Sequence, residues 1–255
     1  NLSSFESVDL SVNGDSILDF SHVKDLDTVN ILESSAGVSL TNIPYDLTKF
    51  NISGSQTGIW SFGFEDNSDS TVDLNWSNNT GANVELTSLA FNEVQSSSII
   101  FDGANEVVLA ALALDPDDTT LTSITNIGDG NLEISTAANI DTLDAVTAIS
   151  LTTTEGGDIS LGSVTSNFGI SDAQKLSTIN LVSSETGQIE LGRIGGTTVV
   201  EDLQSISIIS SGANINVGDI AASKSGTFSA AISSSAVVSV GNMNFEHSGT
   251  SFTAT

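Results

Sequence analysis

The chain has 255 residues, of which 32 are acidic, five are basic and none is cysteine, so its formal charge is −27. Five scattered cations cannot form the basic patch that nucleic acid requires, no apolar run approaches the roughly 18 residues of a membrane span, and no disulfide is possible. A high net charge often indicates disorder, but 38% of the residues are hydrophobic. Most of these are Ile, Val, Leu and Phe, which favour strands, so we expect a folded, β-rich protein.

Two short apolar patterns alternate along the chain. The first has apolar residues at i, i+2 and i+5, begins at Leu18, Phe20 and Val23, and recurs, in full or in part, from residues 38, 60, 84, 107, 132, 159, 189, 215 and 238. The second has them at i, i+3 and i+5, begins at Phe5, Val8 and Leu10, and recurs from residues 26, 47, 146, 176 and 203, with partial copies near 72, 99 and 121. The repeat length averages about 24 residues, and insertions fall in Gly-, Ser- and Asp-rich stretches, which is typical of loops.

Two short strands in every 20 to 30 residues predict the coils of an all-β protein, a β-solenoid (parallel β-helix), in which stacked neighbours complete the core. About ten coils would form a rod roughly 50 Å long at a strand spacing of about 4.8 Å. The alternative is a set of antiparallel β-sandwich domains. A leucine-rich-repeat horseshoe is disfavoured because its Asn or Cys position and its helical half are missing. We expect one elongated domain over 1–255, with an acidic part in 1–158 (net charge −23) and a less charged part in 159–255 (net charge −4).

The residues between paired apolar positions should point outward and stack from coil to coil. No two consecutive rungs of the resulting ladders carry acids, as stacking requires, because like charges at strand spacing are destabilising. The two predicted ladders are Asp9, Asn30, Asn51, Asp73, Ile100, Thr125, Ser150, Asn180 and Ser207, and Asp19, Ser39, Ser61, Glu85, Val108, Glu133, Ser160, Glu190, Asn216 and Ser239.

The segments 176–181 (LSTINL) and 187–194 (GQIELGRI) show the patterns clearly. They resemble the β-strand repeats of bacterial surface-layer proteins, closest in style to the type I secreted, calcium-dependent surface-layer proteins of Gram-negative bacteria and similar giant adhesins. The resemblance covers nearly the whole chain and is one of composition and rhythm. It implies an acidic, cysteine-free, extracellular β-solenoid that assembles into a lattice with calcium at or between subunits. The calcium-binding nonapeptide of that family is absent, and residues 128–130 and 156–158 are only fragments of it.

Calcium sites in this chain would therefore be individual loop sites, or would lie outside it. Calcium takes six to eight oxygen ligands, several of them from carboxylates. Each acidic cluster could equally be a solvated loop that keeps the protein soluble. The candidate metal ligands are Glu65, Asp66, Asp69 and Asp73, then Asp115, Asp117 and Asp118, and finally Asp129 and Asp158.

The leading functional hypothesis is a structural, extracellular or cell-surface protein that assembles with copies of itself into a surface layer, sheath or matrix filament stabilised by cations. The alternative is an adhesin or carbohydrate-binding module that recognises cell-surface polysaccharide through aromatic residues near Trp60 and Trp76. A β-helix carbohydrate-active enzyme ranks third, because His22 and His247 lie at opposite ends and the scattered cations cannot neutralise an acidic polysaccharide. We expect no enzymatic activity, no nucleic-acid partner and no membrane insertion. Since the chain begins at Asn1 without a signal peptide, we also expect a processed product or part of a larger protein.

Overall fold

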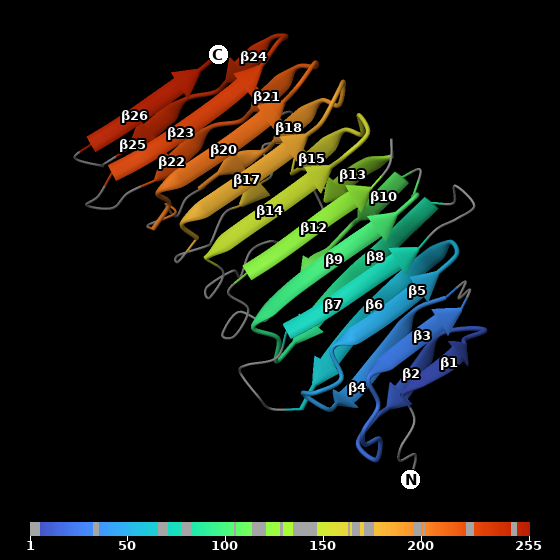
Figure 1. Ribbon diagram of the computed structural model, residues 1–255. Helices are drawn as coiled ribbons and strands as arrows, with labels where there is room; N and C mark the ends of the chain where they lie inside the picture. The colour runs from blue at the N-terminus through green and yellow to red at the C-terminus, as the bar shows by residue number, and fades with distance from the viewer. Residues whose placement is uncertain are drawn as a thin grey trace.

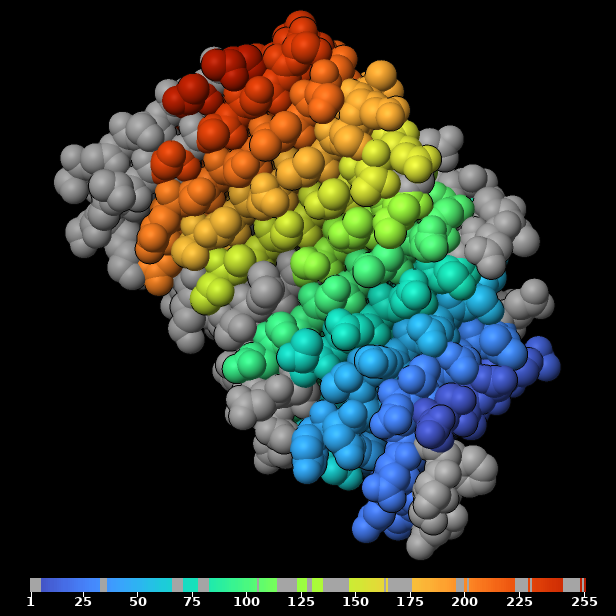
Figure 2. Space-filling view, in the orientation of Figure 1, coloured from blue at the N-terminus to red at the C-terminus, as the bar shows by residue number. Residues whose placement is uncertain are grey.

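The computed structural model describes residues 6–32, 36–65, 71–77, 83–104, 106–113, 121–127, 130–134, 147–162, 164, 169–170, 176–195, 200, 202–222, 227–245 and 249–255. Within these ranges every regular element is a β-strand, and every strand pair is parallel. The strands stack in chain order into a rod with the two termini at opposite ends (Figure 1). Successive coils form diagonal rows across the face in Figure 2. The predicted all-β parallel β-solenoid is therefore confirmed.

Two long sheets and one short sheet form the walls of the rod. The first sheet contains eleven strands: β1 (Ser7–Ser11), β3 (Thr28–Leu32), β5 (Lys49–Ser53), β7 (Thr71–Ser77), β9 (Ser96–Asp102), β12 (Leu121–Ile127), β14 (Ala148–Thr153), β17 (Thr178–Ser183), β20 (Ser205–Ser210), β23 (Thr227–Ser234) and β26 (Gly249–Ala254). The second contains ten: β2 (Ser16–Asp19), β4 (Val38–Ile43), β6 (Gln56–Phe64), β8 (Asn83–Asn92), β10 (Glu106–Leu109), β13 (Asn131–Ile134), β15 (Ile159–Leu161), β18 (Ile189–Leu191), β21 (Ile215–Val217) and β24 (Val238–Val240).

The short sheet contains β16 (Gly169–Ile170), β19 (Arg193–Ile194), β22 (Ile220–Ala222) and β25 (Met243–Phe245), while β11 (Leu112–Ala113) pairs with β8. The first sequence pattern therefore contributes to two sheets. In the coil of Ile189, Leu191 and Ile194, for example, the first two residues lie on β18 of the second long sheet and the third lies on β19 of the short sheet. The number of coils differs slightly from the expected ten, since the two long sheets hold eleven and ten strands.

The core lies between the inner faces of the sheets. Alternation along each strand buries every second residue, so Val29 and Ile31 of β3 are fully buried while Asn30 between them is half-exposed. Aromatic residues fill the part of the core formed by β5 to β9. The Trp60 and Trp76 rings meet edge to face at 5.3 Å, and Phe101 stacks on Trp76 at 5.2 Å. The ring contacts that the structure describes are therefore concentrated in this part of the core.

The predicted ladders are correct in part. Glu85, Val108, Glu133, Ser160, Glu190, Asn216 and Ser239 do stand opposite one another on successive strands. Asp9, Asn30 and Asn51 also form one ladder, in which Asn30 donates to Asp9 at 2.7 Å and Asn51 donates to Asn30 at 2.8 Å. As stacking requires, no acidic residue stands opposite another in any of the strand pairs that the structure describes.

The predicted ladders are wrong at four places. Thr125 stands opposite Thr152, while Ser150 stands opposite Ser123. Asp73 stands opposite Lys49, whereas Asn75 continues the Asn51 ladder. Asp19 stands opposite Thr41, and Glu85 stands opposite Thr57 rather than Ser61. The displacement at Glu85 arises because Trp60 of β6 aligns with Leu89 of β8 rather than with Val84, and the β6–β8 register also shifts by one residue between Gly58 and Ile59. Sheet two thus changes alignment part-way along the rod.

Candidate functional site

The structure describes three of the nine predicted metal ligands. Glu65 is exposed just after β6, and Asp73 is exposed on β7 opposite Lys49. Asp158 is half-buried at the start of β15. As far as the structure describes the chain, no three Asp, Glu or His side chains gather as metal ligands would. The remaining candidates lie outside the described residues: Asp66, Asp69, Asp115, Asp117, Asp118 and Asp129.

Asp158 holds adjacent coils together. Its backbone N–H donates to Asn131 Oδ1 at 3.0 Å, and its own Oδ1 accepts the Gln188 N–H of the following coil at 2.6 Å. The same link recurs elsewhere, where Asn214 Oδ1 accepts the Val237 N–H at 3.2 Å. The carboxylate thus satisfies a backbone donor at the corner between two coils, a structural role that its sequence neighbours did not reveal.

A column of polar side chains lies inside the core from β12 to β23. The column continues the line of Trp76 and Phe101, but its side chains are short and each donates to a carbonyl of the adjoining turn. Thr153 Oγ1 donates to Gly157 O at 2.7 Å, and Ser210 Oγ donates to Gly187 O at 2.8 Å. These bonds satisfy turn carbonyls that would otherwise be buried without a partner. The members are Asn126, Thr153, Ser183, Ser210 and Ser234.

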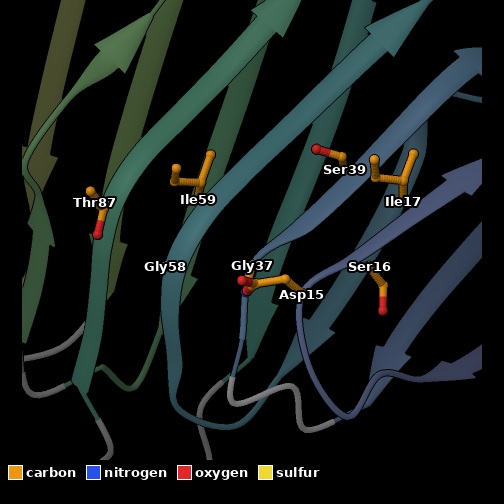
Figure 3. A pocket seen from close by; sticks show the side chains of 8 residues that line it. All are labelled: Asp15, Ser16, Ile17, Gly37, Ser39, Gly58, Ile59 and Thr87. Atoms are coloured by element: carbon orange, nitrogen blue, oxygen red, sulfur yellow. The ribbon is translucent and has the colours of Figure 1, made fainter.

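A hollow of about 550 Å³ opens on the outer face of sheet two, where the register shifts. Figure 3 shows Ile17, Ser39, Ile59 and Thr87 projecting from neighbouring strands around it. Ile17 and Ile59 are 77% and 58% exposed, which is high for large apolar side chains. The hollow therefore offers apolar contact together with three hydroxyls, those of Ser16, Ser39 and Thr87.

Two glycines form the floor of this hollow. A Cβ on Gly37 would lie 2.5 Å from the Ile59 carbonyl oxygen, and one on Gly58, whose φ is +87°, would lie 2.9 Å from the Gly37 nitrogen. Asp15 Oδ1 accepts the Gly37 N–H at 2.9 Å. Asp15, the carboxylate among the residues that line the hollow, thus fixes β2 against the start of β4.

Two carboxylates that were not among the predicted metal ligands lie together on the same face. Glu85 and Glu106 line an open hollow of about 390 Å³. The Asn83 side-chain amide donates to both of them, each at 3.4 Å. Glu133 stands two strands from Glu85, on the far side of Val108. At strand spacing this separates the Glu85 and Glu133 backbones by about 9.6 Å, which reduces their repulsion.

The two tryptophans proposed for sugar stacking are both fully buried. Trp60 donates its indole N–H to the Thr57 carbonyl at 3.2 Å and packs against Trp76 inside the rod. Of the aromatic side chains whose burial the structure describes, Tyr45 is the exposed one, at 58%. The aromatic patch that the carbohydrate-binding alternative requires at Trp60 and Trp76 is therefore not on the surface.

The outermost described strands of the first sheet are β1 and β26. Among the described strands β1 pairs only with β3, and β26 pairs only with β23. At the first end, an apolar cavity of about 240 Å³ opens between β1 and β2. At the other end Met243 is 39% exposed, although Ile220, its equivalent one coil earlier, is 1% exposed. Apolar side chains are therefore less buried in the outermost coils that the structure describes than in the coils between them.

No family model, curated protein or solved structure matches the chain. No helix long and apolar enough to cross a membrane occurs in the part of the chain that the structure describes. The structure itself defines the class, a parallel β-solenoid built from sequence repeats.

Proposed function

We propose that the chain is a structural, extracellular protein of the surface-layer type, which assembles with copies of itself into a surface layer, sheath or matrix filament. The observation that carries this proposal is the regular stack of coils, in which two parallel sheets of eleven and ten strands enclose one continuous apolar core. A stack of this kind presents long, repetitive outer faces, and such faces suit assembly into a lattice or filament.

The polar groups of the protein support a structural role rather than an enzymatic one. Asp158 and Asn214 bind backbone amides of neighbouring coils, and Thr153 and Ser210 bind turn carbonyls. Asp158, Asn214 and Ser210 thus hold neighbouring coils in register, and Thr153 closes the turn of its own coil. The burial of Trp60 and Trp76 likewise favours the structural role over a carbohydrate-binding one.

Calcium is part of the proposal as an assembly factor. A formal charge of −27 opposes the close approach of two copies, and a divalent cation that bridges carboxylates would remove that repulsion. Loop carboxylates and face carboxylates such as Glu85 and Glu106 would supply such contacts between copies. The extracellular location follows from the same requirement, because extracellular calcium is plentiful and modules there bind it at about 0.1–1 mM.

The test is the mass of the purified chain against concentration, measured by sedimentation velocity in four solutions: calcium, magnesium, sodium chloride of equal ionic strength, and excess chelator. We expect the mass to rise above the monomer with concentration, at a lower onset in calcium than in sodium chloride, and to fall again with chelator. A monomer at every concentration would refute the proposed function. Equal onsets in calcium and sodium chloride would refute the calcium part alone.

A further inference from the structure

We propose that two copies of this chain pair face to face through the outer surface of the eleven-stranded sheet between β12 and β23, with the rods antiparallel and β17 of each copy at the two-fold axis. The inference rests on the proposed function and specifies one contact through which copies assemble.

The outer surface of this sheet from β12 to β23 is uncharged. The five strands β12, β14, β17, β20 and β23 contain no acidic or basic residue, and their outward residues are here called the neutral face. In the same coils, Glu133 and Glu190 point outward from sheet two, while Glu155 and Glu185 are exposed in turns. An uncharged centre with a charged surround is the composition that protein interfaces show.

A column of outward β-branched side chains runs along the neutral face. Thr125, Thr152, Val182 and Ile209 stand opposite one another on successive strands. Ile209 is exposed and Val182 is half-exposed. The eleven-stranded sheet faces the viewer in Figure 1, and Figure 2 shows its rows closely spaced from green to orange. Two such surfaces can pack as stacked sheets about 10 Å apart.

Charge identifies a second copy as the occupant of the neutral face. Each copy carries a formal charge of −27, so two copies approach most readily where neither presents an acid. A basic partner would bind the acidic surfaces instead. A polysaccharide would be held by aromatic rings, and β12, β14, β17 and β20 contain no aromatic residue.

The size of the neutral face is sufficient for a pair of modest affinity. Five strands at about 4.8 Å and roughly 20 Å of length for a strand of six residues give about 480 Å² of flat area on each copy. The pair would therefore bury roughly 1,000 Å², which is the lower limit for a specific interface.

The charges outside the neutral face set the orientation of the pair. Asp9, Asp73 and Asp102 point outward from the same sheet, between β1 and β9. Parallel rods would place each of these carboxylates over the same strand of the other copy, whereas antiparallel rods place the two sets on opposite sides of the contact.

An axis at β17 brings the apolar side chains together at the centre. Val182 then faces the partner's Val182, and Ile209 faces the partner's Thr152, whose methyl group is apolar. Such a contact uses the same surface on both copies and closes as a dimer. The acidic surfaces of sheet two stay on the outside, where cations can bridge one pair to the next.

Cysteine cross-linking tests the contact, because the chain has no cysteine of its own. Asn180→Cys places a thiol on β17, so the two thiols of a pair face each other across about 10 Å. Two matched controls replace the same residue type. Asn51→Cys lies on β5 of the same sheet, five strands and about 24 Å from the axis, and Asn216→Cys lies on the outer face of sheet two.

A charge variant provides a second measurement. Asn180→Asp would set two carboxylates against each other in the pair and should weaken pairing by about tenfold or more in sedimentation velocity. Asn51→Asp, outside the neutral face, should leave pairing unchanged. The Asn180 side-chain amide lies 3.3 Å from Ser150 Oγ, and an aspartate can accept a hydrogen bond from that hydroxyl, so the coil should stay folded.

With a thiol-reactive cross-linker about 10 Å long, we expect covalent dimers from Asn180→Cys and monomer from both controls. Assemblies without Asn180→Cys dimers, or equal cross-linking of either control, would overturn this inference and leave the proposed function standing. Binding of monomers to insoluble cellulose or chitin that Asn180→Asp abolishes would also overturn it, because the neutral face would then hold polysaccharide. Wild-type protein that never assembles would overturn both.

Discussion

Replacing Gly187 by alanine tests the close stacking of successive coils. An alanine Cβ at this position would lie 2.1 Å from the Gly157 carbonyl oxygen of the preceding coil, whereas Cβ atoms essentially never come closer than 3.0 Å to such an atom. The coils must therefore separate locally by about 0.9 Å. The Ser183 hydroxyl oxygen would also lie 2.1 Å from this Cβ, and it donates a hydrogen bond of 2.9 Å to the same carbonyl. Neither neighbour can move without weakening the stack.

The expected cost is about 4 kcal/mol, from overpacking at the upper end of its usual 1–3 kcal/mol and one weakened buried hydrogen bond of about 1 kcal/mol. In a chain of this size that loss lowers the melting temperature by roughly 8–16 °C. Circular dichroism melts give the measurement. Gly63→Ala is the matched control, because its Cβ would meet only the Leu40 carbonyl oxygen, at 3.6 Å. A Gly187→Ala melting temperature within about 2 °C of wild type, or an equal loss from Gly63→Ala, would show that the coils are not packed this closely.

Three further predictions concern hydrogen bonding and charge. Ser210→Ala should lower the free energy of unfolding in urea by about 1–3 kcal/mol, because the Ser210 hydroxyl bonds both the Gly187 carbonyl and the Ala213 N–H. Ser207→Ala on the outer face is the control and should lower it by under about 0.5 kcal/mol. Equal losses from the two variants would contradict the role of the polar column. Hydrogen bonds from Asn42 and Ser21 hold the pKa of Asp19 below its ordinary value. Its small stabilising contribution is therefore complete above about pH 4 and is lost as the pH falls through the lowered pKa. Asp19→Asn should flatten the plot of unfolding free energy against pH only in that acid range, and a difference from wild type that is the same at every pH would contradict this. Raising the sodium chloride concentration from low salt to about 0.15 M should raise the melting temperature, because screening relieves the repulsion within a chain of charge −27. An unchanged melting temperature would mean that the charges are already neutralised.

The sequence repeats predicted the fold because each coil buries the same few apolar positions. Register was predictable wherever one coil differs from the next only in its turns, as from Glu85 to Ser239 along sheet two. It failed at β6 and β8, because Leu86 and Leu89 of one strand occupy two adjacent apolar columns and a sequence pattern cannot tell which of them continues from Trp60.

The polar groups were harder to predict than the apolar ones. Thr153 and Ser183 follow inward-facing leucines at the correct spacing for the core, yet hydroxyl side chains normally indicate the outer face. Their burial becomes intelligible only when the turn carbonyls that they bind are seen. The predicted metal ligands depend on loop conformation and contacts between copies, neither of which a repeat pattern encodes, so calcium binding stays a prediction.

Fibre diffraction from oriented assemblies tests the proposed self-assembly most directly. If copies form a filament with their coils stacked along its length, the strand spacing of about 4.8 Å must run along the fibre axis. Assemblies whose 4.8 Å reflection lies perpendicular to the fibre axis, or that give no oriented reflection, would contradict the account.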